Sequence, residues 1–184
     1  MAITVDITEK DLVQACLRQD GKAQTQLYKK YSPVMFAICL RYSANPDNAK
    51  DMLQEAFIRV FDRLDKFRFE GSFEGWLKRV AVTTCLDFNK KLKIEPYAEE
   101  IDNFTHLGAE AGVLSQMGAN DLINLLQKLP VGYRTVFNLF AIEGYGHAEI
   151  AQMLEINENT SKTQLFKARK MLQAFVLNSD KSIE

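Results

Sequence analysis

Residues 47–93, DNAKDMLQEAFIRVFDRLDKFRFEGSFEGWLKRVAVTTCLDFNKKLK, contain the pattern that decides the fold of this chain. Over Asp47–Asp65, apolar residues recur every three or four positions, which places them on one face of a helix. The opposite face is polar except for Ile58, an apolar side chain where water is expected. The stretch therefore predicts an amphipathic helix with an apolar residue on its outer face.

A loop of aromatic and charged residues follows over Lys66–Phe73, and a second helix is predicted from about Ser72 to Lys91. Ser72 can cap this helix, and Glu74 suits its positive end. Its basic edge consists of Lys78, Arg79, Lys90, Lys91 and Lys93. Aromatic rings beside cations hold single-stranded nucleic acid, because rings stack on bases while cations contact phosphates. The alternative is that these aromatic residues only cover a hydrophobic core.

Length and composition suit one large or two small globular domains without cofactors or metal sites. The chain has 184 residues, of which 47% are hydrophobic and 26% charged. No apolar run reaches the roughly 18–20 residues of a membrane span, and Met1–Asp11 lacks a signal-peptide pattern. We therefore expect a cytoplasmic protein without membrane insertion. Cys16, Cys39 and Cys85 are far apart in apolar helical patterns, which predicts reduced core thiols.

Charge is distributed unevenly although the formal net charge is only −1. Lys and Arg exceed Asp and Glu over residues 59–93, and residues 160–173 carry Lys and Arg without any acid. Residues 95–121 have acids and neither Lys nor Arg. Two basic modules joined by an acidic connector are predicted. The connector is either a solvated tether or a segment that competes with nucleic acid for a basic surface.

The first module, Thr8–Lys93, is predicted to be an all-helical domain of about five helices. One helix starts at Thr8 and another spans about Lys22–Tyr31. A third is expected to restart at Ser32-Pro33, because proline suits the first turn of a helix. Residues 94–120 lose periodicity and gain Gly and Pro, which predicts a flexible linker.

The second module, residues 121–177, has the order of a helix-turn-helix domain. Helices are predicted over Gly132–Glu143, His147–Leu154 and Asn159–Leu177. The order is a short helix, a turn of about four residues and a longer helix with a basic face. In a helix-turn-helix domain, the second of these helices enters a DNA major groove. The predicted class is all-α, with two small helical domains joined by a flexible acidic linker.

Both modules resemble the extracytoplasmic-function group of bacterial RNA polymerase sigma factors. DMLQEAFIRVF (51–61) and FEGWLKRVAV (73–82) are similar to region 2, a helical bundle. HAEIAQML (147–154) and TSKTQLFKARK (160–170) are similar to region 4, a helix-turn-helix domain. The resemblance spans about Asp11–Leu172. It implies a protein that binds core RNA polymerase and promoter DNA, with an anti-sigma factor as a further partner.

The resemblance also implies site residues, position by position. Core polymerase would dock on Asp51, Gln54, Glu55 and Ile58, which accounts for the apolar Ile58. The minus-ten element would meet Arg68, Phe69, Gly71, Ser72, Phe73, Trp76, Lys78, Arg79, Thr83 and Lys90. The minus-thirty-five element would meet Lys162, Thr163, Phe166, Lys167, Arg169 and Lys170. Family members usually carry Asn at the position of Thr83 and often Gly at that of Glu155, so a left-handed turn at Glu155 would be strained.

Two other readings are open. A helix-turn-helix regulator that acts without polymerase would leave Ile58 and the aromatic loop unexplained. An enzyme is not expected, because His106 and His147, the two histidines, lie on different segments without a nucleophile or metal ligands.

Overall fold

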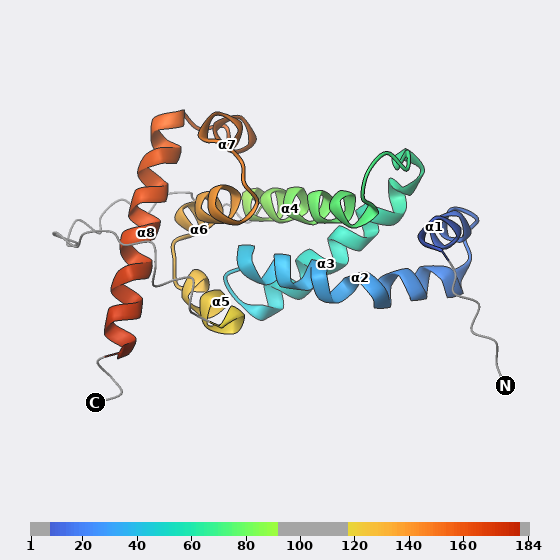
Figure 1. The fold of residues 1–184 in the computed structure, drawn as a ribbon, viewed down its shortest axis with the longest axis horizontal. Coiled ribbons are helices and arrows are strands. Elements are labelled where there is room, and N and C mark those ends of the chain that lie inside the picture. Colours follow the sequence, from blue (N-terminus) through green and yellow to red (C-terminus); the bar gives the residue numbers. More distant parts are fainter. Residues whose placement is uncertain (1–7, 92–117, 181–184) are drawn as a thin grey trace. The chain divides into compact units, whose positions relative to one another are not determined.

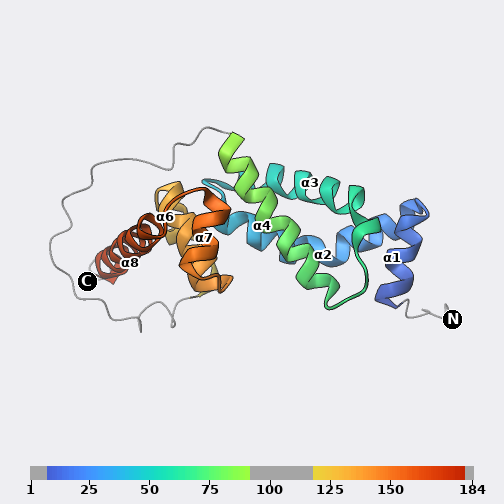
Figure 2. The ribbon, with the colours of Figure 1, turned by 90° about the horizontal axis from the view of Figure 1, so that it is seen from above.

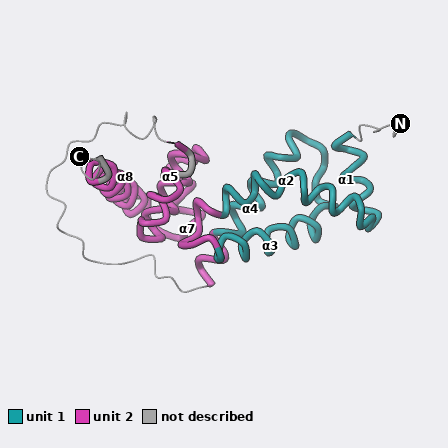
Figure 3. Tube along the Cα trace, turned by 90° about the horizontal axis from the view of Figure 1, so that it is seen from below, with its two compact units in different colours: residues 1–39, 47–85 teal, residues 40–46, 86–184 magenta. Residues whose placement is uncertain are grey.

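The computed structural model describes residues 8–91 and 118–180, and every regular element in this part of the chain is a helix (Figure 1). The predicted all-α class is confirmed. The chain divides into unit 1, residues 1–39 and 47–85, and unit 2, residues 40–46 and 86–184 (Figure 3). Residues 1–7 and most of the predicted linker lie outside the described residues. None of the described helices is long and apolar enough to cross a membrane.

The N-terminal helices differ in one respect from the prediction. Helix α1, Glu9–Leu17, is capped by Thr8, whose side chain accepts a hydrogen bond from the Asp11 N–H. The predicted break at Ser32-Pro33 is wrong, because α2 runs without interruption over Gly21–Tyr42 (Figure 2). Proline inside a helix removes a hydrogen bond and costs about 3 kcal/mol. Burial of Tyr31, Met35 and Ile38 on both sides of Pro33 outweighs that cost, at about 1.5–3 kcal/mol for each large apolar side chain.

The two helices predicted over residues 47–93 are present. Helix α3 spans Pro46–Asp62 and is followed by a short 3-10 helix, η1, over Leu64–Lys66. Helix α4 spans Phe73–Lys91, and the Ser72 hydroxyl accepts a hydrogen bond from the Gly75 N–H at 3.2 Å. The apolar face of α3 is buried as predicted: Ala49, Met52, Leu53, Ala56, Phe57 and Val60.

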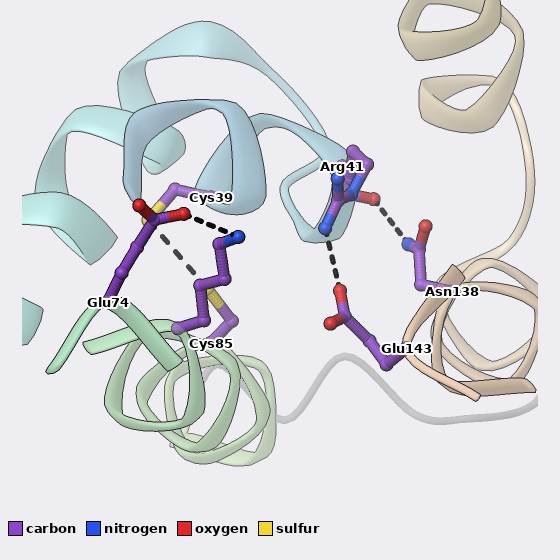
Figure 4. Close-up of polar contacts among 7 residues, drawn as sticks. Cys39, Arg41, Glu74, Cys85, Asn138 and Glu143 are labelled. Carbon is purple, nitrogen blue, oxygen red and sulfur yellow. Dashed lines mark hydrogen bonds and ion pairs between the residues drawn. The ribbon is translucent and has the colours of Figure 1, made fainter. Parts of the chain in front are cut away.

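The cysteines are buried thiols, as predicted. Cys39 of α2 and Cys85 of α4 are fully buried in unit 1, and their sulfur atoms are 3.9 Å apart (Figure 4). Burial, followed by the charge of Asp20, raises the pKa of the Cys16 thiol. Cys16 is therefore protonated at neutral pH and acts as a small apolar side chain.

Unit 2 contains the helix-turn-helix order. It comprises α5 (Ala119–Gln127), α6 (Val131–Phe137), η3 (Asn138–Ile142), α7 (His147–Leu154) and α8 (Glu158–Asp180). The single helix predicted over Gly132–Glu143 is wrong in detail, because η3 is a π-helical turn. Such turns are rare and occur mostly as single insertions in α-helices. The α7 bounds match the prediction.

Polar contacts join the last turn of α2, within residues 40–46, to the other helices of unit 2. The Asn138 side-chain amide donates to the Arg41 carbonyl at 2.7 Å, and the Arg41 guanidinium pairs with Glu143 at 2.6 Å (Figure 4). Gln127 donates to the Leu40 carbonyl at 3.2 Å. Arg134 of α6 is also buried and donates to the Gln127 carbonyl, and burial lowers the pKa of its guanidinium to about 10.

Candidate nucleic-acid interface

The loop between η1 and α4 is held by contacts among aromatic rings. Phe67 contacts Phe73 and Trp76, with ring centroids 5.0 and 5.6 Å apart. Two loop residues have positive φ, Phe69 at 57° and Gly71 at 91°. The left-handed conformation costs Phe69 energy but not Gly71, and Phe69 stays 39% exposed. Phe67 and Phe73 therefore cover the core, whereas Phe69 is exposed to solvent.

A hollow of about 420 Å³ opens beside this loop. Phe67 and Trp76 give it apolar walls, and Lys66, Arg68 and Arg79 give it cations; Glu70, Ser72 and Gly75 complete the lining. The hollow is thus surrounded by rings, which can stack on a base, and by guanidinium groups, which can donate to base or phosphate acceptors. Of the residues predicted to meet the minus-ten element, Phe69, Gly71, Phe73, Lys78, Thr83 and Lys90 do not line it.

Several of these remaining residues have partners within the protein. Phe73 is fully buried, so it supports the loop from the core. Lys78 pairs with Glu74 at 2.7 Å, and Lys90 pairs with Glu155 at 2.9 Å. The exposed Thr83 has its hydroxyl 2.9 Å from the Arg79 carbonyl and 3.0 Å from the Val80 carbonyl of its own helix. Its only proton is used there, so Thr83 could act toward a base only as an acceptor.

The outer face of α3 is polar around one apolar side chain. Asp51 and Gln54 are exposed, and Glu55 pairs with Arg59 at 3.1 Å. Ile58 is 57% exposed, the most exposed of the large apolar residues described. An exposed aliphatic residue among polar neighbours is the composition expected of a docking surface centre.

Helix α8 presents the predicted major-groove residues to solvent. Thr163 and Lys167 are exposed, and Phe166 is 55% exposed with the Lys170 ammonium 4.7 Å from its ring centroid. Lys162 pairs with Glu158 at 2.7 Å, and this hydrogen bond lowers the pKa of the Glu158 carboxyl. Arg169 lies over the Phe140 ring, with its guanidinium carbon 5.7 Å from the ring centroid.

A polar contact between α7 and α8 was not predicted. Nδ1 of His147 forms a 2.9 Å hydrogen bond with the hydroxyl of Ser161, which is fully buried. The imidazole also stacks on Phe140, with ring centroids 4.5 Å apart. The signal in the sequence was Ser161 itself, since it shares the helical spacing of Leu165, Ala168 and Leu172. A hydroxyl within a buried stripe needs a partner.

The turn between α7 and α8 is strained at the expected residue. Glu155 has φ 57° and ψ 40°, the left-handed conformation that glycine adopts freely. For a residue with a Cβ this conformation costs about 1–2 kcal/mol.

Comparisons with known proteins agree with this geometry. The Sigma-70 region 2 pattern matches residues 27–93, and the Sigma-70, region 4 pattern matches residues 119–172. The chain is 27% identical over 179 residues to a protein of Haemophilus influenzae named ECF RNA polymerase sigma-E factor, covering 91% of this chain and 94% of that protein. It is 28% identical over 176 residues to ECF RNA polymerase sigma factor SigW of Bacillus subtilis, covering 89% and 94%.

Among solved structures, the chain resembles the sigma factor RpoE of Bartonella quintana, determined in complex with the anti-sigma factor NepR. The TM-score is 0.50 at 20% identity, and the match covers 83% of this chain and 95% of that one. This likeness concerns the fold. The two family patterns and the full-length relatives together show that the chain belongs to the extracytoplasmic-function group of sigma-70 RNA polymerase sigma factors.

Proposed function

We propose that this chain binds core RNA polymerase and directs it to promoters through three sets of residues. Asp51, Gln54, Glu55 and Ile58 dock on the polymerase. The hollow beside the aromatic loop, with the neighbouring cations of α4, receives the minus-ten element. The exposed side of α8 reads the minus-thirty-five element. Residues 8–93 and 121–177 act as the two functional domains, and residues 94–120 link them.

The observation that carries this proposal is the hollow lined by Phe67, Trp76, Arg68 and Arg79. Strand separation requires an unstacked base to be held somewhere, at a cost of a few kcal/mol for each flipped base. Base–aromatic stacking recovers about 1–3 kcal/mol, and the cations offset the approach of phosphates. Phe69, Gly71, Ser72 and Phe73 set the shape of the loop, while Lys78, Thr83 and Lys90 lie along α4 where the strand would continue.

On α8, the exposed side chains match the chemistry of base edges. Lys162 and Lys167 can donate to guanine acceptors, Thr163 can contact either base type, and Phe166 offers an apolar contact to a thymine methyl group. Arg169 and Lys170 are better placed for phosphates. In this proposal the protein carries out no chemistry of its own, needs no cofactor, and works in the cytoplasm with the polymerase.

Partners follow from the relatives' names. Those relatives are RNA polymerase sigma factors, and the B. quintana protein was solved with an anti-sigma factor. Core RNA polymerase, promoter DNA and an anti-sigma factor are therefore the proposed partners here.

The decisive experiment is reconstitution with purified core RNA polymerase. The wild-type chain should co-elute with core enzyme and direct initiation from a defined start site on a promoter template. Ile58→Glu should weaken this association while helicity and melting temperature stay nearly unchanged, because Ile58 lies outside the core. A chain that binds DNA specifically but has no affinity for core enzyme would instead be a regulator that acts alone.

A further inference from the structure

A second hollow, of about 370 Å³, lies in unit 1 where the end of α1 meets the end of α3 and η1. Leu17, Phe61 and Leu64 give it apolar walls, and Asp62 and Asp65 stand at it as carboxylates. Neither Lys nor Arg is among its lining residues. Leu17 is 41% exposed although it ends an apolar helix face.

This hollow continues the face of α3 that carries Ile58. Residues three and four apart are neighbours on a helix surface, so Phe61 and Asp62 lie directly beyond Ile58. Phe61 is half-buried and contacts the buried ring of Phe57, with the ring centroids 6.2 Å apart. Ile58 and Phe61 thus lead from the outer face of α3 into the hollow.

The charge of the hollow indicates what kind of group it would accept. No ion pair is found for Asp62 or Asp65 among the described residues, in contrast to Glu55 and Glu74. A guanidinium or ammonium group entering the hollow would meet two carboxylates, and its aliphatic stem would cover Leu17 and Phe61.

We infer that this hollow is a second part of the polymerase-docking surface, and that it receives a segment of core RNA polymerase presenting Arg or Lys beside apolar side chains. The inference rests on the proposed function, because it takes the Ile58 face as the start of the docking surface. Two observations favour this occupant over a second copy of the chain or an anti-sigma segment. The hollow is continuous with Ile58 through Phe61, and its carboxylates complement a basic side chain.

Two variants test the inference by equilibrium binding to core polymerase. Leu17→Asp places a charge on the apolar wall, and Asp62→Asn removes one carboxylate near the C-terminal end of α3. Each should weaken core binding on the order of tenfold, as for a centrally placed interface residue. Asp62→Asn should also flatten the dependence of core affinity on salt concentration, since screening acts on the charge pair that it removes.

Matched controls separate docking from folding. Val34→Asp alters an aliphatic residue of α2 that is 37% exposed and does not line the hollow. Asp11→Asn neutralises a carboxylate in the first turn of α1. Both controls should bind core polymerase like wild type, and all four variants should keep the wild-type circular dichroism spectrum.

The outcomes distinguish this inference from the proposed function. If Ile58→Glu binds core polymerase as well as wild type does, the docking assignment itself fails. If Ile58→Glu binds weakly while Leu17→Asp and Asp62→Asn retain wild-type affinity, only the second docking site is overturned. It is also overturned if these two variants change only self-association in sedimentation or only binding of an anti-sigma factor.

Discussion

Single residues expected to contact DNA are already engaged within the protein. Lys78, Lys90 and Lys162 pair with Glu74, Glu155 and Glu158. Exposed ion pairs contribute about 0–1 kcal/mol, so each lysine can exchange its carboxylate for a phosphate or a base at little cost. We therefore expect these carboxylates mainly to repel DNA whose base sequence offers no specific contact.

Glu158→Gln tests this exchange. The substitution keeps the size of the side chain but removes the charge that holds Lys162, so affinity for non-specific duplex should rise a few-fold at low salt. Affinity for a matched minus-thirty-five duplex should rise less, and the specificity ratio should fall. Fluorescence anisotropy on both duplexes measures this ratio, and Glu149→Gln on α7 is the control. An unchanged ratio would mean that Glu158 plays no part in discrimination.

The ion pair between Glu158 and Lys162 also responds to pH. The hydrogen bond from Lys162 lowers the pKa of Glu158 in the folded protein relative to the unfolded chain. The stability that the pair contributes is therefore present above the ordinary glutamate pKa and is lost as pH falls through the lowered folded value.

Lys167 is one of the residues proposed to read bases. It is exposed on α8 and has no ion-pair partner among the described residues. Lys167→Ala should cost about 1–3 kcal/mol on the preferred duplex and relax the preference at one base pair. Selection from a randomised minus-thirty-five duplex checks this, with Lys170→Ala as the control for a phosphate contact. An equal loss on every sequence would make Lys167 a phosphate contact too.

At the scale of helices, Pro33 shows how tertiary contacts override a local signal. Because α2 continues through Pro33, the missing N–H costs stability that alanine would restore. Pro33→Ala should raise the free energy of unfolding by about 2 kcal/mol, the proline penalty less its effect on the unfolded chain. Urea unfolding of the full chain measures this change, with Ser32→Ala as the control. A destabilised variant would indicate that the proline ring itself packs usefully.

Most elements were predictable from local patterns, and the exceptions have physical causes. Thr8 and Ser72 marked helix starts through their side-chain acceptors. Ile58 could be placed on the outer face because its spacing alone excludes it from the buried stripe. The passage of α2 through Pro33 and the π-helical turn at Asn138–Ile142 depend on contacts between distant segments. The lining of the hollow beside the aromatic loop could not be predicted either, since it depends on the path of a loop that has positive φ at Phe69 and Gly71.

At the scale of the whole molecule, transcription initiation requires two steps. One part of the chain binds duplex DNA, and another part opens it. A net charge of −1 does not predict DNA binding, but local cations do. In the proposed function, promoter opening depends on the hollow beside the aromatic loop rather than on overall charge. Because Phe73 is fully buried, replacing it would remove a core ring at about 3–5 kcal/mol and confuse folding with function.

Opening is better tested by changing only cations that line the hollow. Arg68→Ala combined with Arg79→Ala should spare core binding and closed-complex formation, because the docking residues and α8 are unchanged. Open-complex formation on intact duplex should fall at least tenfold, as expected when roughly 1.4 kcal/mol or more of strand-holding energy is lost. A template already mismatched over the minus-ten element should restore part of the activity, since the mismatch removes the cost of unpairing but not the need for base contacts. Permanganate reactivity of thymines on both templates reports these states, and Arg63→Ala combined with Lys29→Ala removes the same charge elsewhere in unit 1. If the hollow variant opens intact duplex as well as this control does, the hollow is not where the separated strand is held.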